Sequence, residues 1–365
     1  MPKITLFSDG ETWTGFQSVS IRQSMDNAAH SFSLTTTDRG NEGLDRWNIR
    51  GGSEVQIYID ETLAFDGFVQ RYNPRIDANS HSINIAGASR AIDLVECSHD
   101  GKYFWKDVSA ESIISEVLEP FHIEYRIDGE MKRIEKTGFR VGVTDSPFAI
   151  VRKLAEKNGL TVYTDSNNTL ILSNRPSETL FADIKRGQYL ALEVNHDLSQ
   201  SFSEVVVKAQ QNSTSKDFKG KQQVERRFQN PVQTRHRPLI VSSNGTDPDQ
   251  QNLGEYAKRR FAGNVLLATA TVKAAFRDSN NADSKLWGIN QLVFVDDPVA
   301  DIRHNLLISE VEFNLSEGAG FQTNLNMRLP EAYSDRPAKR PQVRRSKGEF
   351  GELASAFLDE NTGTI

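Results

Sequence analysis

The sequence predicts an α+β fold that is mainly β, with two antiparallel β-barrel-like domains flanking an inserted α/β domain. Two regions, residues 1–98 and 181–333, carry apolar residues at every second position, which is the period of a half-buried strand. Between them, residues 99–180 place apolar residues at helical spacing. Residues 334–365 lose both patterns and begin with a basic cluster, so we expect a flexible basic tail there.

The first β domain is best marked by a meander. Val55, Ile57 and Ile59 alternate with polar residues, and the alternation resumes after a polar turn at residues 60–61 and again at 83–85. Strands of this kind leave unpaired edges, which proteins cover by closing a barrel or by pairing with another chain. The pattern alone therefore makes self-association an expectation.

The inserted domain contains a helix with clear end signals. Ser146 is a favourable N-cap, Pro147 fits the first helical position, and Gly159 supplies a left-handed stop. Two short strands, at residues 160–163 and 169–172, are joined by Asp, Ser and Asn residues that suit a tight turn. These elements predict a compact α/β unit.

The second β domain is predicted from a hairpin near its end. Residues 307–315 and 321–329 alternate between apolar and polar, and a turn at 316–320 connects them. A further strand is expected at 266–276, where the same alternation occurs. Residues 209–250 are rich in Gln, Asn, Ser, Lys and Arg, so we expect them to form long loops.

Composition disfavours several classes of function. The chain has 365 residues, with 43 Lys and Arg against 49 Asp and Glu and a net charge of -6, which disfavours tight binding to nucleic acid. A single cysteine excludes an intrachain disulfide and fits folding in a reducing cytoplasm. No apolar segment approaches the roughly 20 residues of a membrane span, so stable membrane insertion is not expected.

We expect no cofactor and no metal centre. The sequence has no glycine-rich phosphate loop, and its seven histidines are scattered without the spacing or the cysteine pairs of a zinc site. Asp247 and Asp249 could serve as calcium ligands, but a turn followed by a helix cap uses the same residues and is the preferred interpretation.

We also expect no catalytic residues and no enzymatic activity. Asp296 and Asp297 are adjacent, which places them on opposite strand faces or in a turn before Pro298, and not as the spaced carboxylate pair of a glycosidase. Cys97 has His99 two residues on, but a thiolate nucleophile requires a base placed by the fold. A buried structural cysteine is the preferred interpretation.

The tail at residues 334–365 is the expected partner-docking segment. Its basic residues could contact DNA, but runs of this kind are more often solvated linkers or docking arms. Apolar residues further along have amphipathic spacing, enough for a short helix that folds against a partner. The residues we expect to dock a partner are Arg340, Arg344, Arg345, Phe350, Leu353 and Phe357.

Four segments together resemble a known family. They are TWTGFQSVSIRQSMDNAAHSFSLTTT at residues 12–37, GASRAIDLVECS at 87–98, DSPFAIVRKLAEKNGLTVYTD at 145–165, and the segment at 286–333 that begins LWGINQLVFVDD. Their order resembles the Mu-like phage baseplate hub proteins of contractile tails, which are related to the hub part of type VI secretion spikes. Residues 334–365 match no motif of that family, and residues 209–250 are only loosely similar to it.

The resemblance implies a homotrimer in which two β-barrel-like domains per subunit alternate around a channel continuous with the tail tube. It implies that the α/β unit lies outside this ring. The implied partners are a separate spike protein, the tail tube and other baseplate proteins, with DNA only in transit. The chain would act in the virion tail baseplate after assembly in the host cytoplasm. Because phosphates must pass without sticking, we expect a channel lined by polar and acidic side chains.

Two alternative functions are compatible with the sequence. A β-rich carbohydrate-binding or adhesin-like tail module would use exposed aromatic residues, for which Trp13, Trp47 and Trp105 are the candidates. Packing in a core or an interface is the preferred interpretation of all three. A cell-wall hydrolase, the less favoured alternative, would need a carboxylate pair in a cleft.

Overall fold

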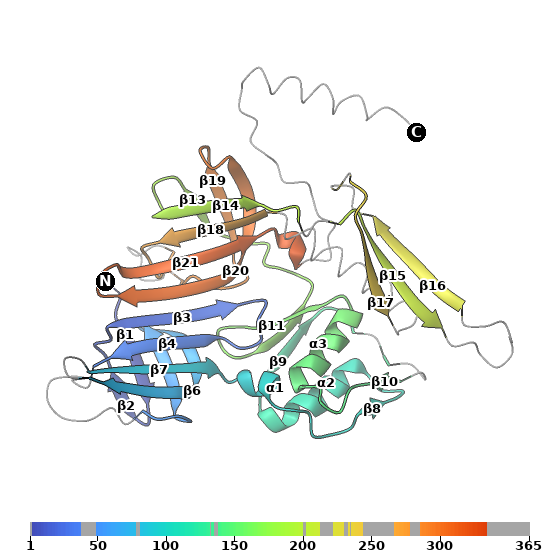
Figure 1. Ribbon diagram of the computed structural model, residues 1–365, viewed down its shortest axis with the longest axis horizontal. Coiled ribbons are helices and arrows are strands. Elements are labelled where there is room, and N and C mark those ends of the chain that lie inside the picture. The colour runs from blue at the N-terminus through green and yellow to red at the C-terminus, as the bar shows by residue number, and fades with distance from the viewer. Residues whose placement is uncertain are drawn as a thin grey trace, which may run out of the picture.

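The fold is built around one large β-sheet, with an α/β unit and a small three-stranded sheet beside it (Figure 1). Thirteen of the described strands join the large sheet. The computed structural model describes residues 2–37, 49–77, 81–131, 133–134, 138–199, 202–211, 222–229, 233, 235–243, 266–277 and 285–333.

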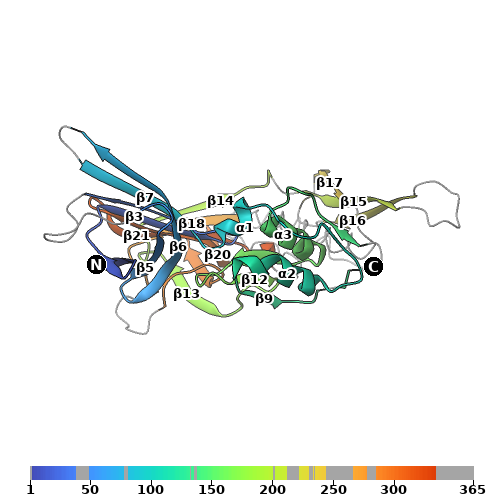
Figure 2. The same cartoon turned by 90° about the horizontal axis from the view of Figure 1, so that it is seen from below.

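The first half of the large sheet confirms the predicted meander. Its strands are β1 (Ile4–Ser8), β2 (Glu11–Trp13), β3 (Ser18–Ser24), β4 (Ser31–Thr36), β5 (Glu54–Ile59), β6 (Thr62–Ile76) and β7 (His81–Ser89). They lie in the order β3-β4-β7-β6-β5-β1-β2, and each neighbouring pair is antiparallel. Figure 2 shows the far end of the β6–β7 hairpin projecting away from the rest of the sheet.

The second half contains the predicted hairpin, and its strands carry the sheet to its other edge. The strands are β13 (Leu180–Lys185), β14 (Ala191–His196), β18 (Leu266–Val272), β19 (Leu292–Asp297), β20 (Ile302–Ser316) and β21 (Gly320–Arg328), followed by the short helix η2 (Pro330–Ala332). The hairpin of β20 and β21 is confirmed. The strand expected at 266–276 ends at Val272, because the chain then leaves the ladder and the Ala274 carbonyl accepts a bond from the Thr323 hydroxyl at 2.9 Å.

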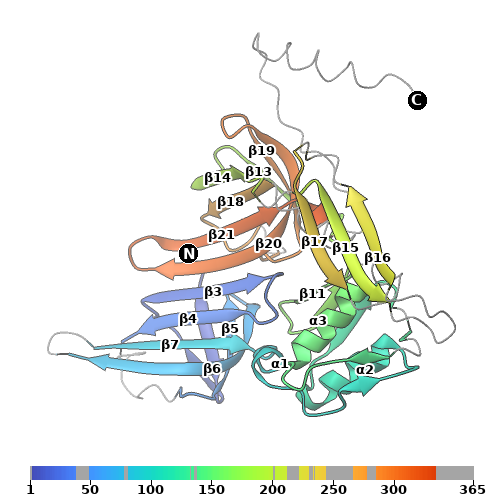
Figure 3. The same cartoon turned by 45° about the vertical axis from the view of Figure 1, so that its right-hand side comes forward.

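The mainly β composition agrees with the predicted α+β fold, and the two β regions join in one continuous sheet. β20 is long enough to pair with β19 along its first part and with β3 along its last part. Among the strands that the structure describes, neither half closes into a barrel. Figure 3 shows the two halves stacked above one another, and a single apolar core lies behind both.

The two halves repeat one strand order. The first runs β3-β4-β7-β6-β5-β1 and the second β14-β18-β21-β20-β19-β13. β6 and β20 have 15 residues each, and β7 and β21 have nine each. Each long strand has a bulge where it pairs with its nine-residue partner, at Gln70 in β6 and at Ser309 in β20. β6 has a second bulge at Ala64, where it pairs with β5. The repeat differs at its end, since β1 is antiparallel to β5 while β13 is parallel to β19.

The α/β unit follows β7 and confirms the predicted helix. Ser146 accepts a hydrogen bond from the Ala149 amide at 3.2 Å, Pro147 opens the helix, and Gly159 has φ +72° just beyond its end. The elements are α1 (Ile92–Glu96), β8 (Phe104–Trp105), α2 (Ala110–Leu118), η1 (Glu119–Phe121), β9 (Tyr125–Asp128), β10 (Phe139–Arg140), α3 (Pro147–Lys157), β11 (Thr161–Thr164) and β12 (Leu170–Ser173). None of the described helices is long and apolar enough to span a membrane.

The α/β unit is held against the first half of the large sheet by two contacts from its β11–β12 turn. His30, in the loop after β3, donates from Nε2 to the Asp165 carbonyl at 3.2 Å. Asn168 donates from its side-chain amide to the carboxylate of Asp66 at 2.8 Å and to its carbonyl at 3.2 Å. Asp66 also accepts from Arg90 Nε at 2.7 Å, so its carboxylate is shared between the sheet and the unit.

The polar stretch at residues 209–250 was wrongly predicted to be only long loops. It contributes to a three-stranded sheet of β15 (Glu204–Gln211), β16 (Gln222–Gln229) and β17 (Pro238–Ser243). Val205, Val207 and Phe228 are buried on one face of this sheet, with Leu239 and Val241 packed against them. A few apolar residues at strand spacing therefore outweigh the polar composition of the stretch.

Candidate functional site

The face of the large sheet that points away from the core is polar. Along β20, Val311 and Phe313 are buried in the core, while Glu310 and Glu312 point outward between them. β21 and β18 alternate in the same way. We call this outward surface the polar face; its central residues are Ser20, Arg22, Thr269, Thr271, Glu310, Glu312, Asn324 and Asn326.

A first chain of hydrogen bonds crosses the polar face from β18 to β3. The Thr271 hydroxyl donates to Asn324 Oδ1 at 2.9 Å, and Asn324 Nδ2 donates to Glu312 Oε2 at 3.2 Å. The Ser20 hydroxyl donates to the other oxygen of Glu312 at 3.0 Å. The amide of Asn324 thus lies between a donor and an acceptor, which fixes its orientation.

A second series of hydrogen bonds runs parallel to the first and is displaced by two residues along each of β18, β20 and β21. The Thr269 hydroxyl donates to Asn326 Oδ1 at 2.8 Å, and Asn326 Nδ2 donates to Glu310 Oε1 at 2.8 Å. Arg22 donates to Glu310 Oε2 at 2.8 Å, and this bond raises the pKa of the Arg22 guanidinium. These two series of side-chain hydrogen bonds therefore connect four strands, in addition to the backbone hydrogen bonds of the sheet.

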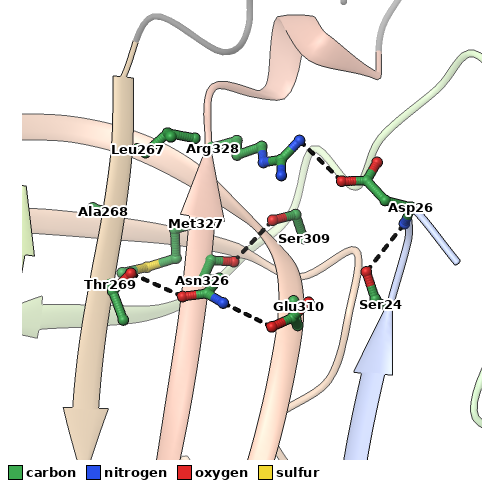
Figure 4. A pocket seen from close by; sticks show the side chains of 10 residues that line it. All are labelled: Ser24, Asp26, Leu267, Ala268, Thr269, Ser309, Glu310, Asn326, Met327 and Arg328. Atoms are coloured by element: carbon green, nitrogen blue, oxygen red, sulfur yellow. Dashed lines mark hydrogen bonds and ion pairs between the residues drawn. The ribbon is translucent and has the colours of Figure 1, made fainter. Parts of the chain in front are cut away.

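A pocket of about 200 Å³ opens at one end of the polar face (Figure 4). The bulge lies here, and the Ser309 hydroxyl donates to the Asn326 carbonyl at 3.1 Å. Arg328 and Asp26 form an ion pair at 2.9 Å, and Glu310 is held by Arg22. Both carboxylates that line the pocket are therefore in ion pairs, and the pocket is a polar recess. Its lining residues are Ser24, Asp26, Leu267, Ala268, Thr269, Ser309, Glu310, Asn326, Met327 and Arg328.

The polar face continues on both sides of its centre and carries charges of both signs. Strand pairing extends it to β14 on one side and to β4, β7 and the end of β6 on the other. The residues there are mostly Ser, Thr, Asn and Ala. Its charged residues in the described strands are Arg22, Arg71, Arg75, Glu193, Glu310, Glu312 and Arg328.

The six residues expected to dock a partner lie outside the described residues. They are Arg340, Arg344, Arg345, Phe350, Leu353 and Phe357. Asp247 and Asp249 lie outside them as well. Within the described ranges, no group of three or more His, Cys, Asp and Glu side chains is placed to hold a metal ion.

Two of the three tryptophans are buried, which confirms the preferred interpretation of core packing for them and argues against sugar stacking. Trp13 is 6% exposed and packs in the core behind the sheet, and Trp105 is 4% exposed in the core of the α/β unit. Trp105 also donates from its indole nitrogen to Glu116 at 3.0 Å. Trp47 lies outside the described residues.

The adjacent acids at the end of β19 have a structural role. Asp296 is half-buried, while Asp297 is buried and points to the other face, as their adjacency predicted. Asp297 accepts from the backbone amides of Val299 at 2.7 Å and Ala300 at 2.8 Å and from the Tyr189 hydroxyl. The hydroxyl of Tyr189 and these amides lower the pKa of Asp297, which holds the turn into β20 as a carboxylate.

Cys97 differs from its expected buried state. Its side chain is exposed at the end of α1. His99 is buried, and its Nε2 lies 3.1 Å from the carbonyl oxygen of Lys102, three residues on in the chain. The two residues do not form a hydrogen-bonded nucleophile and base in the described structure, so the geometry offers no catalytic pair.

Comparison with known proteins gives consistent matches over the whole chain. Residues 3–89 match the family described as Mu phage baseplate assembly protein GpP-like, N-terminal, and residues 91–174 match baseplate hub protein gp44-like, second domain. The baseplate hub protein gp44 of Escherichia phage Mu is 24% identical over 370 residues, covering 98% of this chain and 95% of that protein.

Two solved structures share the fold. The 43 kDa tail protein of prophage MuSo2 from Shewanella oneidensis has a TM-score of 0.78 at 21% identity, covering 91% of this chain and 99% of that one. The tail protein from Neisseria meningitidis MC58 has a TM-score of 0.76 at 18% identity, covering 92% and 99%. The continuous sheet and the α/β unit thus form an arrangement shared with tail proteins.

Proposed function

The chain carries two domains of Mu-like phage baseplate hub proteins, and from that premise we propose that three copies close into a hub ring at the tail tip. The ring joins the tail tube to the central spike and encloses a channel through which DNA passes. The family matches support a structural role for the chain in a phage baseplate.

The observation that carries the proposal is the polar face. A sheet that buries one face and covers the other with Ser, Thr, Asn and paired charges is suited to line an aqueous channel. The hydrogen-bonded chains from Thr271 and Thr269 to the glutamates hold these side chains in place. The face carries Arg as well as Glu, so the proposed channel is polar with mixed charge and not predominantly acidic.

The mixed charge has a physical consequence for passage. A strongly basic wall would bind phosphates and retard the DNA, because each Lys or Arg contact releases counterions and adds affinity. Two of the arginines on the polar face, Arg22 and Arg328, are already paired with Glu310 and Asp26. Pairing of this kind lowers the field that a passing phosphate meets.

The partners in this proposal are other copies of the chain, a separate spike protein, the tail tube and further baseplate proteins. DNA is a partner only in transit. The chain acts in the virion tail baseplate and assembles in the host cytoplasm. The basic and amphipathic residues between 334 and 365 remain the proposed docking segment for one of these proteins.

The test is the mass of the purified 365-residue chain in solution, measured by light scattering across a dilution series. A ring of three has about three times the 40.9 kDa of one chain and persists on dilution. Electron microscopy of that species should then show a ring with a central hole. A monomer at every concentration contradicts the proposed ring.

A further inference from the structure

The junction between β3 and β20 has a counterpart that is incomplete within one chain. After its bulge, β20 pairs with β3 from Glu310 opposite Ser24 to Ser316 opposite Ser18. In the repeated strand order, β6 takes the place of β20 and β14 takes the place of β3. Among the described strands, the part of β6 after its Gln70 bulge pairs with β7 alone, and β14 pairs with β18 alone.

We propose that these two open edges pair with each other between copies: the end of β6, Arg71–Ile76, of one subunit joins β14 of the next as an antiparallel strand. The proposal rests on the proposed function for the number of copies in the ring. It adds the contact through which the ring closes. Each copy would supply one β6 end and one β14, which is the head-to-tail arrangement that generates rings.

Two equivalent rows of paired residues fix the register. Each row begins at the residue that follows the bulge at Gln70 in β6 or at Ser309 in β20, and it crosses three neighbouring strands. The first row is Arg71, Ala86, Ser33 and Ser20. The second row is Glu310, Asn326, Thr269 and Glu193. Glu193 in β14 is therefore the counterpart of Ser20 in β3.

This equivalence assigns a partner to each residue of the β6 end. In the junction, Ser20 lies opposite Asn314, which is four residues after Glu310. The residue four after Arg71 is Arg75, so the same register places Arg75 of one copy opposite Glu193 of the next. Both side chains are exposed in the single chain, and opposite charges facing each other across a strand pair are stabilising.

The other side of the β6 end is apolar and supports the same register. Ile76 is 77% exposed, and the register places it opposite Leu192, which already packs against the sheet's core. Pairing would bury Ile76 as a continuation of that core. Pro74 lies in the segment and has no amide hydrogen, so the backbone ladder has one bond fewer than a full one.

The charges also distinguish the proposed contact from the internal junction. In the junction, β3 carries a base, Arg22, and β20 carries the acids Glu310 and Glu312. In the proposed contact the signs are reversed, since β14 carries an acid and the end of β6 carries two bases. A β6 end that approached β3 would meet a like charge, which opposes the wrong pairing.

Cysteine cross-linking tests the register directly. In a Cys97→Ser background, chains with Arg75→Cys are mixed with chains with Glu193→Cys and oxidised mildly. Residues directly opposite in an antiparallel pair have Cα atoms about 4.5–5.5 Å apart, within reach of a disulfide. We expect a disulfide-linked dimer of the two chains. The matched control, Arg71→Cys with Glu193→Cys, is offset by four residues, roughly 13 Å, and should not cross-link.

Charge reversal gives a second readout that does not depend on disulfide chemistry. Arg75→Glu and Glu193→Arg should each weaken self-association by roughly tenfold in light scattering. The double variant should recover it, which also shows that both substitutions leave the chain folded. If the wild-type chain forms trimers but the 75–193 pair neither cross-links nor rescues, the proposed pairing is overturned while the ring stands. If the wild-type chain stays monomeric, the ring itself is overturned.

Discussion

Arg22 and Glu310 are 288 positions apart in the sequence, yet the guanidinium of one lies 2.8 Å from the carboxylate of the other across the junction of β3 and β20. The junction joins the two halves of the sheet, and its core side is apolar. Its stability therefore combines core packing with a polar network on the opposite face.

The core side of the junction is tested by Phe313→Ala. Phe313 is 1% exposed on β20 and packs between strands of both halves. Removing the ring leaves a cavity, and we expect a loss of roughly 3–5 kcal/mol in the free energy of unfolding, measured by urea denaturation. Phe7→Ala, at a 41% exposed site on β1, is the matched control and should cost far less. Equal losses at the two sites would contradict this account of the core.

The polar side is tested by Asn326→Asp. The new carboxylate would face Glu310, whose Oε1 now accepts from Asn326 at 2.8 Å. We expect a loss of about 1–3 kcal/mol at neutral pH, because a donor is lost and like charges meet. The loss should shrink as pH falls and one carboxyl is protonated. Asn305→Asp, at an exposed position of β20, should change neither the stability nor its dependence on pH. A loss of stability in Asn326→Asp that does not change with pH would argue against charge repulsion as its cause.

Stability should depend on pH through His30. Burial lowers the pKa of His30, and its Nδ1 is buried with no hydrogen-bond partner among the described residues. Below the unfolded-state pKa of about 6.5, the unfolded chain binds more protons than the folded one, so stability should fall as pH drops. Denaturation midpoints from pH 7.5 to 5 would show this slope. His30→Gln should flatten it, while His236→Gln, at an exposed site, should not.

The attachment of the α/β unit is tested at Asn168. This residue has φ +63° and donates to both the carboxylate and the carbonyl of Asp66. Asn168→Gly removes the hydrogen bonds and keeps the backbone unstrained, whereas Asn168→Ala also forces a side chain into the left-handed region. We expect the Ala variant to be less stable than the Gly variant by about 1 kcal/mol in thermal unfolding. Identical stabilities would place the whole effect in the hydrogen bonds.

Much of the local structure could be predicted from the sequence, because local rules decide it. Ser146, Pro147 and Gly159 mark the ends of α3 through capping, fixed φ and left-handed freedom. The hairpin of β20 and β21 was evident from strict alternation. The strands β16 and β17 of the small sheet were missed, since their few buried apolar residues are spread among polar ones that suit loops equally well.

The polar face could not be predicted, because it depends on which strands become neighbours. The sequence shows that Glu312 and Asn324 point away from a core, but pairing across the hairpin and then with β3 decides that Ser20 joins them. The same holds for the two open edges. Alternation marks β6 and β14 as strands, while their equivalence to β20 and β3 emerges only from the order of strands in the sheet.

The long-range pairing of β3 with β20 also sets an order of events during synthesis. A ribosome that adds roughly 5–20 residues per second releases β20 some 15–60 s after β3. Throughout that interval the edge of β3 in the nascent first half is unpaired, and Arg22 lacks its partner Glu310. The last strands to be made therefore protect the first, and a chain released before Ile302 would present that edge to every other nascent chain nearby.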